Sequence, residues 1–566
     1  MTLTALRIAN FKAFAATQRV PLKPITLIYG ANSAGKSSVI HALALAHHAI
    51  ETGNLNVQRT QIGGESIDLG GFRQYVHRRE RGRQVELSFE TNPRHLSGHL
   101  AELLRSVQEI VVKLAIGEVG TSEVDREDAI QVERFEMELD SKPLLSMSGR
   151  AGGLLRLDRL DHSQPIFREL LRLAMTGPDI REKISAASGE ILDELVPSIT
   201  ARSRGLFPRV EKMPESSEVD EGDGKNLEAA LRRALRELMG GLGKALEEEI
   251  RRLRYLGPLR SYPPRHLAFS QHHDPNRLAG GGYAWDMVRT NADVRQRVNA
   301  WLGDANRLKT PYELEVRDLL PAAVVSRELP AKLHKAIHDR VAFLLAGRDV
   351  DIIRDLPSRA NQVAERIDDL DIENPDDIIP EIAELVAAVT DIDDEMLAEV
   401  WAEEMVKKQA GELQDLVLID KRTNTPVSHR DVGIGVSQVL PVLVSAYASE
   451  NELLAIEQPE IHLHPALQAE LGDVFLESAL GGDGNTFLIE THSEHLLLRI
   501  MRRMRETNIG ELPDGMPEVC PEDVMVLFVE PDGPQSIVRE MPLNERGELV
   551  KAWPGGFFEE GLREIF

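Results

Sequence analysis

Residues 30–37 read Gly-Ala-Asn-Ser-Ala-Gly-Lys-Ser, and this octet constrains the fold more than any other segment. It fits the pattern G-x-x-x-x-G-K-[ST]. An apolar, β-rich run beginning at Ile25 precedes it, and a run with helical spacing of apolar residues from Val39 follows it. In such a strand–loop–helix context the backbone N–H groups and the helix N-terminus surround a phosphate. The octet therefore predicts a nucleotide site in an α/β fold.

The residues of this loop are expected to surround the phosphates of a nucleotide. Lys36 would reach the β- and γ-phosphates of ATP, and the hydroxyl of Ser37 would hold Mg²⁺. The alternative interpretation is an ordinary glycine turn. The expected nucleotide-binding residues of the loop are Gly30, Ala31, Asn32, Ser33, Ala34, Gly35, Lys36, Ser37 and Ser38.

The length and composition are those of a globular protein with a large core. At 566 residues the chain is expected to form two or three subdomains. It has no apolar run close to the roughly 20 residues that cross a bilayer, and its N-terminus lacks a secretory signal, so no membrane partner is expected. Cys520 is the single cysteine, which excludes an intramolecular disulfide and a zinc site built from several cysteines. A cytoplasmic location is the default expectation.

The formal net charge of −26 makes high non-specific affinity for nucleic acid unexpected, because such a surface repels a polyanion on average. Any contact with DNA would have to come from local basic patches. The candidates are residues 78–83, 251–254 and 502–505, each rich in arginine. The alternative is that each patch is a solvated helix face.

A second acidic strand end completes the pattern of a nucleotide site. Residues 452–460 read Glu-Leu-Leu-Ala-Ile-Glu-Gln-Pro-Glu, an apolar strand that ends in an acid. This is the Walker B pattern, in which the acid holds Mg²⁺ directly or through water beside the P-loop serine. Glu457 is the acid at the strand end and is the expected second metal ligand.

Two further segments point to the same site. Residues 487–493 read Phe-Leu-Ile-Glu-Thr-His-Ser, and His492 would lie at the carboxyl edge of the sheet, where it could sense the γ-phosphate or order the attacking water. Residues 431–441 bring glycines and a serine to a helix start, which favours an anion. This second anion site makes sense if it closes over the ATP of a partner. Its expected contributors are Gly433, Gly435, Ser437 and Gln438.

Together these pieces resemble the ABC-type ATPase heads of the SMC, RecF and overcoming-lysogenization-defect branch. The order matches: P-loop, long insertion, signature segment, Walker B strand and switch histidine. The run 457–465 looks like the D-E-P-E-x-x-L-H-P version of that branch. Residues 553–559 resemble the W-P-x-G-F-F tail of a prokaryotic subgroup, and 256–260 also look like that subgroup. The resemblance covers about half the chain.

The resemblance implies an α/β fold: a P-loop ABC-type ATPase head with a mixed sheet and an antiparallel β layer, split by helical insertions. Lys225–Leu256 is amphipathic and helical in pattern, with a break expected at Gly240–Gly243. The expected parts are an N-terminal half of the head with P-loop and β layer (1–162), a helical insertion (163–255), a connecting segment (256–326), an acidic helical insertion (327–410), the C-terminal half of the head (411–510) and a tail domain (511–566).

The resemblance also implies a homodimer that binds ATP between its heads. Each site would pair Lys36, Ser37 and Glu457 of one protomer with the 433–438 segment of the other, and hydrolysis would release the dimer. The Q-loop of the family should follow the first helix, where Gln61 and Gln74 both qualify.

One departure from the family concerns catalysis. The family usually has Asp-Glu where this chain has Glu457-Gln458, and the second residue is the general base. Glutamine cannot accept a proton at neutral pH. Either Glu457 or Glu460 supplies the base, or hydrolysis is slow and the protein is mainly an ATP-gated clamp. Our prediction is slow hydrolysis, with Gln458 and His492 in the site and both glutamates near the metal.

Three weaker patterns can be explained without a further active site. Glu460, His462 and His464 alternate, and on a strand they would share a face and could bind a metal, but packing behind the Walker B strand is favoured. Ser493 lacks the surroundings of a hydrolase nucleophile. The roughly 70 residues after His492 are short for a nuclease domain, so a nuclease or toxin would be a separate partner.

The leading hypothesis is an ATPase whose dimer state is set by ATP and which acts as a sensor or motor in DNA maintenance or anti-phage defence. One alternative is a RecF-like clamp that binds DNA through arginines 251, 252 and 254. Another is a regulatory scaffold that holds a separate effector.

Overall fold

The structure is a computed structural model. The chain forms two compact units, within which most of the contacts between residues lie. The first contains residues 1–263, 272–312 and 429–566, and the second contains residues 264–271 and 313–428. The acidic helical insertion expected at 327–410 lies outside the described residues. These are 3–93, 96, 98–118, 130–150, 152–174, 194–203, 205–211, 223–261, 276–303, 307, 309–318, 414–427 and 434–558.

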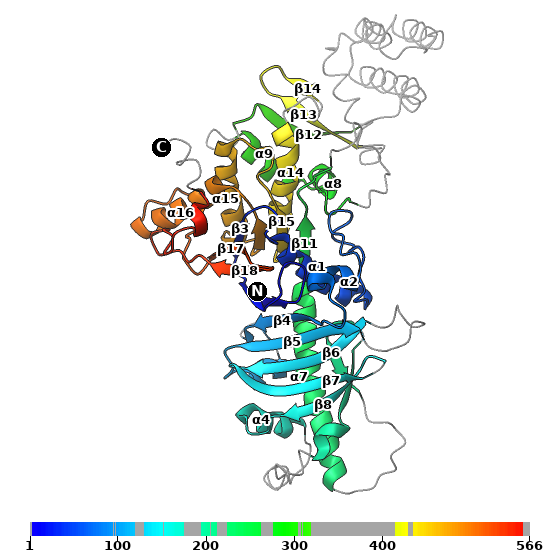
Figure 1. The fold of residues 1–566 in the computed structure, drawn as a ribbon. Coiled ribbons are helices and arrows are strands. Elements are labelled where there is room, and N and C mark those ends of the chain that lie inside the picture. Colours follow the sequence, from blue (N-terminus) through cyan, green and yellow to red (C-terminus); the bar gives the residue numbers. More distant parts are fainter. Residues whose placement is uncertain are drawn as a thin grey trace, which may run out of the picture. The chain divides into compact units, whose positions relative to one another are not determined.

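A six-stranded mixed sheet carries the P-loop strand at its centre (Figure 1). Its strands from β11 to β17 are parallel, and β18 closes one edge as an antiparallel hairpin with β17. Every residue of β3 is buried, as expected of a parallel strand covered on both faces. The expected parallel α/β core is therefore confirmed. In sheet order the strands are β11 (Leu253–Leu256), β15 (Leu453–Glu457), β16 (Thr486–Glu490), β3 (Ile25–Gly30), β17 (Val524–Asp532) and β18 (Gln535–Glu540).

Four helices follow strands of this sheet or lead into them. They are α1 (Ser37–Thr52), α14 (Ile434–Tyr447), α15 (Pro465–Leu480) and α16 (Glu494–Ile509). Helix α15 packs against α14 and α16. Two side chains fix helix starts: His464 accepts a hydrogen bond from the amide of Ala466, and Ser493 accepts one from the amide of Leu496.

A nine-stranded antiparallel sheet forms the second layer of the first unit. The antiparallel layer expected from the short strands between 84 and 160 is confirmed, and its edges are extended by strands from both sides of that range. In sheet order the strands are β10 (Pro208–Val210), β9 (Thr200–Ser203), β8 (Leu154–Leu160), β7 (Lys142–Arg150), β6 (Ile130–Leu139), β5 (Ile110–Glu118), β4 (Val85–Thr91), β1 (Leu3–Ala9) and β2 (Gln18–Pro21).

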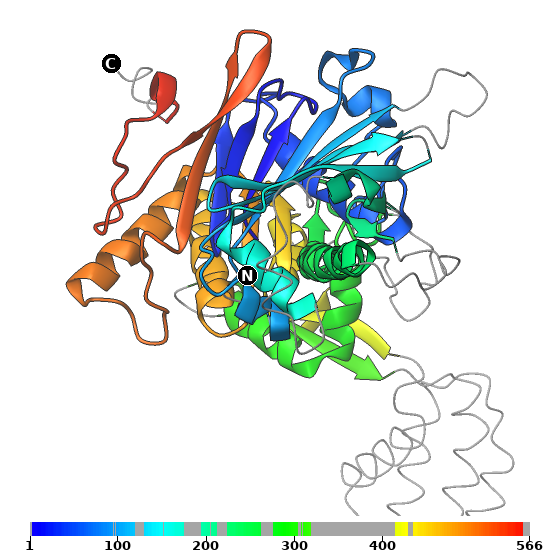
Figure 2. The ribbon, with the colours of Figure 1, turned by 90° about the horizontal axis from the view of Figure 1, so that it is seen from below.

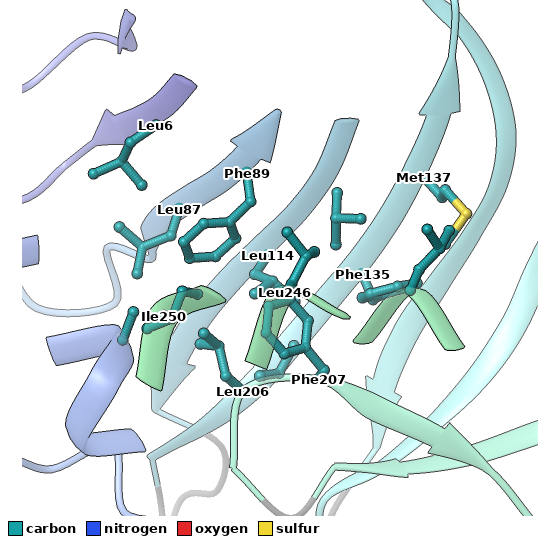
Figure 3. Packing of buried hydrophobic residues seen from close by; sticks show 14 of the residues in the cluster. Leu6, Leu87, Phe89, Leu114, Phe135, Met137, Leu206, Phe207, Leu246 and Ile250 are labelled. Carbon is teal, nitrogen blue, oxygen red and sulfur yellow. The ribbon is translucent and has the colours of Figure 1, made fainter. Parts of the chain in front are cut away.

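The long helix α7 (Asp223–Arg251) covers this sheet, and Figure 2 views it nearly along its axis beneath the strands. Leu246 and Ile250 face apolar side chains of the sheet, including Leu87 and Phe89 (Figure 3). The same helix also packs against α1 and β10. Because burial of apolar area is the main stabilising term, α7 ties the P-loop helix to the antiparallel sheet.

The break expected at Gly240–Gly243 is wrong: α7 continues through it. Two of the glycines face close neighbours. A Cβ on Gly241 would lie 2.9 Å from Leu100 Cδ2, and one on Gly243 would lie 3.3 Å from Phe207 Cβ. The helical pattern also ends earlier than Leu256, because residues 253–256 form strand β11. The stretch 163–255 thus contains three strands as well as helix.

The remaining elements connect these layers. In the first unit they are α2 (Phe72–Tyr75), η1 (His77–Arg79), α3 (Gly98–Leu103), α4 (Pro165–Ala174), η3 (Val196–Ser198), α8 (Tyr283–Thr290), α9 (Ala292–Gly303) and η5 (Pro554–Gly556). A three-stranded sheet belongs mainly to the second unit, in the order β12 (Tyr312–Asp318), β13 (Gln414–Asp420) and β14 (Thr425–Val427). Within the described part of the chain, no helix combines the length and apolar character needed to span a bilayer.

Candidate functional site

The loop between β3 and α1 depends on its glycines. Gly30 has φ 143° and Gly35 has φ 95°, conformations that favour glycine. A Cβ on Gly30 would lie 2.1 Å from the carbonyl oxygen of Val529, and one on Gly35 would lie 2.4 Å from Ala13 Cβ. Helix α1 begins at Ser37, and the side chain of its N-cap residue, Lys36, makes no capping hydrogen bond. The loop and the helix start therefore present backbone donors for an anion.

The side chains of Lys36 and Ser37 both make polar contacts in the loop and with Glu490. Lys36 Nζ donates hydrogen bonds to the carbonyl oxygens of Gly30 at 3.2 Å and Ala31 at 3.0 Å. The same nitrogen lies 3.7 Å from Glu490 Oε1. Ser37 Oγ donates a hydrogen bond to Glu490 Oε2 at 2.7 Å. A carboxylate at the end of β16 thus contacts the side chains of both Lys36 and Ser37.

Glu457 and Glu490 end neighbouring parallel strands and are register partners in the β15–β16 pair. Both are buried, at 7% and 5% exposure. Glu457 Oε1 accepts a hydrogen bond from the hydroxyl of Tyr255 at 3.0 Å and lies 3.9 Å from His41 Nε2. Lys12 Nζ lies 2.5 Å from His41 Nδ1. Because the lysine is a donor, His41 Nδ1 accepts and its Nε2 carries the hydrogen that faces Glu457.

The burial of these groups moves their pKa values. Desolvation and the neighbouring Glu490 raise the pKa of Glu457 to about 7. Burial also raises the pKa of Glu490. Burial and the nearby Lys12 lower the pKa of His41 to about 3, so this imidazole is neutral at pH 7. The pKa of Lys12 falls to about 8, mainly by desolvation. The ionised forms of these two neighbouring carboxyl groups are therefore poorly stabilised by the groups around them.

This surplus of buried carboxylate fits a divalent cation. Carboxylate and hydroxyl oxygens are the ligands that Mg²⁺ prefers, and Mg²⁺ is bound with one or two carboxylates plus substrate phosphates. Ser37, Glu457 and Glu490 present such oxygens beside the P-loop lysine. The residues present thus fit Mg²⁺ together with a nucleotide.

Three residues next to these strand ends have buried polar atoms that find no hydrogen-bond partner among the described residues: Arg260 Nε and Nη1, Glu460 Oε2 and His492 Nε2. Their other atoms are engaged. Arg260 Nη2 donates to the backbone oxygens of Glu457 and Gln458, at 3.2 and 3.1 Å. Glu460 Oε1 accepts from the amide of His492 at 2.7 Å. Because unpartnered buried polar atoms are costly, this edge of the sheet fits a polar ligand or water.

The structure places the other expected residues as follows. Gln458 has φ 47°, and its amide donates to the carbonyl oxygen of Glu490 at 2.7 Å. Gly435 lies at the start of α14, where a Cβ would come within 3.2 Å of the backbone oxygen of His462. Ser437 and Gln438 are buried, and Gly433 lies outside the described residues. The second anion segment is thus described only in part.

Of the two Q-loop candidates, Gln74 lines a cavity of about 630 Å³ together with Lys12, Arg78 and Arg79. Gln61 is exposed on a turn and is not part of that lining. Since Lys12 also contacts His41 on α1, the cavity adjoins the P-loop helix. Gln74 thus lines the same cavity as a lysine that contacts α1, whereas Gln61 does not, and the choice between them stays a prediction.

The weaker signals have structural explanations. Residues 459–462 form a turn rather than a strand, so Glu460, His462 and His464 do not alternate on one face of a strand. Among the described residues, no group of three or more histidine, cysteine or acidic side chains could hold a metal ion. Ser493 caps α16, and its hydroxyl donates to Gln468 at 2.7 Å, as expected of a structural serine.

Several residues of the site were missed by the sequence reasoning. Glu490 carried a usable signal, because it ends an apolar strand just as Glu457 does. The sequence singles out Arg260 only as the last residue of the segment 256–260, and Tyr255 lies directly before that segment. Lys12 and His41 gave no signal, since their contact joins a loop after β1 to the first turns of α1.

Two family models match the chain. Residues 5–144 match one described as "AAA domain", and residues 268–499 match one described as "AAA domain, putative AbiEii toxin, Type IV TA system". The first match contains the P-loop, and the second contains the strands that end in Glu457 and Glu490. Both matched segments therefore resemble AAA domains, and the residues that cluster at the ends of β3, β15 and β16 come from both of them.

Similar solved structures are heads of SMC proteins. An SMC head bound to the C-winged helix domain of ScpA is 10% identical, with 96% of this chain and 98% of that chain covered and a TM-score of 0.33. An SMC head with an extended coiled coil, bound to the C-terminal domain of ScpA, from Pyrococcus furiosus is 11% identical. The match covers 100% of this chain and 98% of that chain, with a TM-score of 0.31. The SMC head domain from Thermotoga maritima is 8% identical, with 96% of this chain and 100% of that chain covered and a TM-score of 0.33. No curated protein matches the chain.

Proposed function

We propose that the protein is an ATP-dependent molecular switch of the SMC/RecF type, which binds Mg-ATP at its P-loop and hydrolyses it slowly. The observation that carries the proposal is the cluster of Lys36, Ser37, Glu457 and Glu490 at one edge of the mixed sheet. Lys36 and the backbone of the loop would bind the phosphates, and Ser37 with Glu457 would hold Mg²⁺. The bound Mg²⁺ would neutralise charge that develops on the phosphates.

The dimer is part of the same proposal. The segment 433–438 would close over the ATP of a partner head, with the start of α14 as its helix N-terminus. His492 Nε2 has no hydrogen-bond partner among the residues that the structure describes, so it could respond to the γ-phosphate. Two heads would therefore associate when ATP is bound and separate after hydrolysis. Gln458 in place of an acid would keep the dimer long-lived.

We further propose a role in anti-phage defence or DNA maintenance. The defence arm is supported by the description of one matching family model, which names a type IV toxin–antitoxin system. The DNA-clamp alternative gains less support, because Arg251, Arg252 and Arg254 are paired with glutamates. A scaffold that holds a separate nuclease or toxin is compatible with the same ATP switch.

The test is the molecular mass of the purified protein with and without Mg-ATP, measured by light scattering on a sizing column. Wild type should double in mass with Mg-ATP, and Lys36→Ala should not. The matched control is Lys244→Ala on the exposed side of α7, whose side chain is 73% exposed. A wild-type protein that neither binds ATP nor changes mass would overturn the proposal.

A further inference from the structure

We propose that Glu490 is the proton acceptor for ATP hydrolysis and supplies the carboxylate that position 458 lacks. The inference rests on the proposed function, because it assigns a catalytic residue within the same ATP site. It concerns a residue on β16, the strand that lies between β15 and the P-loop strand β3.

The strand order brings Glu490 closest to the P-loop. Strand β16 pairs directly with β3, with Glu490 opposite Ile28, whereas β15 is separated from β3 by β16. Neighbouring strands lie about 4.8 Å apart, so Glu457 starts one strand spacing further from the loop. The carboxylate of Glu490 accordingly contacts Ser37 Oγ at 2.7 Å and lies 3.7 Å from Lys36 Nζ.

These two contacts locate Glu490 at the γ-phosphate end of the site. In a P-loop the lysine reaches the β- and γ-phosphates and the serine hydroxyl holds the metal. A carboxylate within reach of both side chains is close enough to the γ-phosphate to contact a water bound there. General-base catalysis needs the base within hydrogen-bond reach of the water, directly or through a second water.

The other carboxylates of the site are engaged differently. Glu460 accepts the amide hydrogen of His492 with one oxygen. Glu457 accepts a hydrogen bond from the hydroxyl of Tyr255, on the neighbouring strand β11, and faces His41 on α1. Neither has a contact with Lys36 or Ser37 among the hydrogen bonds and ion pairs of the described residues. Glu490 is the one carboxylate among the three that touches both.

A water oxygen forms a bond to the γ-phosphorus of ATP, and Glu490 takes one proton of that water. The bond between the γ-phosphorus and the β–γ bridging oxygen breaks, and ADP leaves with that electron pair. Phosphate and ADP are the products, and Glu490 returns its proton to solvent or to phosphate. In the loaded site the hydroxyl of Ser37 would leave Glu490 and would be able to hold Mg²⁺.

The experiment separates binding, assembly and chemistry in the full chain. Wild type, Glu490→Gln, Glu457→Gln and the control Glu248→Gln, which lies on the exposed side of α7, are compared. Three quantities are measured: affinity for a fluorescent ATP analogue with Mg²⁺ and with EDTA, mass with Mg-ATP, and the turnover rate. Glutamine keeps the size of the side chain and can still accept the hydrogen bond from Ser37.

We expect Glu490→Gln to bind the analogue with the Mg²⁺ dependence of wild type, to stay trapped as an ATP-bound dimer, and to lose turnover by a factor of about 10² to 10⁴. Glu457→Gln should instead lose the Mg²⁺ dependence of binding. Turnover unchanged in Glu490→Gln would overturn the inference, and so would loss of its Mg²⁺-dependent binding, which would make Glu490 a metal ligand. Failure of wild type to bind ATP would instead refute the proposed function.

Discussion

Replacing Glu457 with glutamine should change how the stability of the nucleotide-free protein depends on pH. Burial and Glu490 raise the pKa of Glu457 from 4.5 to about 7 in the folded protein. Between these two values the folded state keeps a proton that the unfolded state has lost, so the stability of wild type falls as pH rises. The shift is worth about 3 kcal/mol at 1.36 kcal/mol per pH unit. Glutamine does not titrate and removes this contribution.

The assay is thermal unfolding at pH 5 and pH 8 in EDTA, because bound metal would change the charge balance. For a cooperative unit of roughly 400 residues, about 3 kcal/mol corresponds to a change in Tm of about 4 °C. The Tm of Glu457→Gln relative to wild type should therefore rise by about that amount from pH 5 to pH 8. Glu248→Gln should show no such change. A constant Tm difference across this range would mean that Glu457 ionises normally, and the account of two competing buried carboxylates would be wrong.

Three further outcomes follow from the contacts. Tyr255→Phe removes a hydrogen bond that lowers the pKa of Glu457, so at pH 7 more Mg²⁺ should be needed for ATP binding, and the deficit should shrink at pH 9. Gly240→Ala should raise stability by about 0.5–1 kcal/mol, since its Cβ would meet nothing within 4 Å; unfolding at equal or lower temperature than wild type would refute this. Trp553→Ala should lower stability by about 1–3 kcal/mol and weaken ATP binding, because its ring packs edge-on against Tyr29, just before the P-loop; unchanged affinity would rule out this coupling.

The parts of the site that are local in sequence could be predicted. The octet at 30–37 specifies its own loop, because lysine, serine and glycines are each required by geometry or chemistry within eight residues. The acid at 457 could likewise be found at the end of an apolar run. In both cases the information lies inside one element and its immediate flanks.

The parts that depend on the order of strands could not be predicted. Nothing within residues 486–490 says that this strand lies next to β3, and that neighbour relation is what brings Glu490 to Ser37. The contact of Lys12 with His41 is of the same kind. The break predicted at residues 240–243 was wrong for another reason. Local propensity favours a break there, but packing against Leu100 and Phe207 keeps the helix intact.

The position of β3 in its sheet has a consequence for the synthesis of the chain. Its hydrogen-bonded neighbours are β16 and β17, which begin at residues 486 and 524, while β3 itself ends at residue 30. At roughly 5–20 residues per second, a ribosome needs about 25–100 s to deliver those partners. During that time an apolar strand waits without its sheet, exposed to other nascent chains. The P-loop is therefore made long before its neighbouring strands, and the growing chain should depend on chaperones that shield such strands.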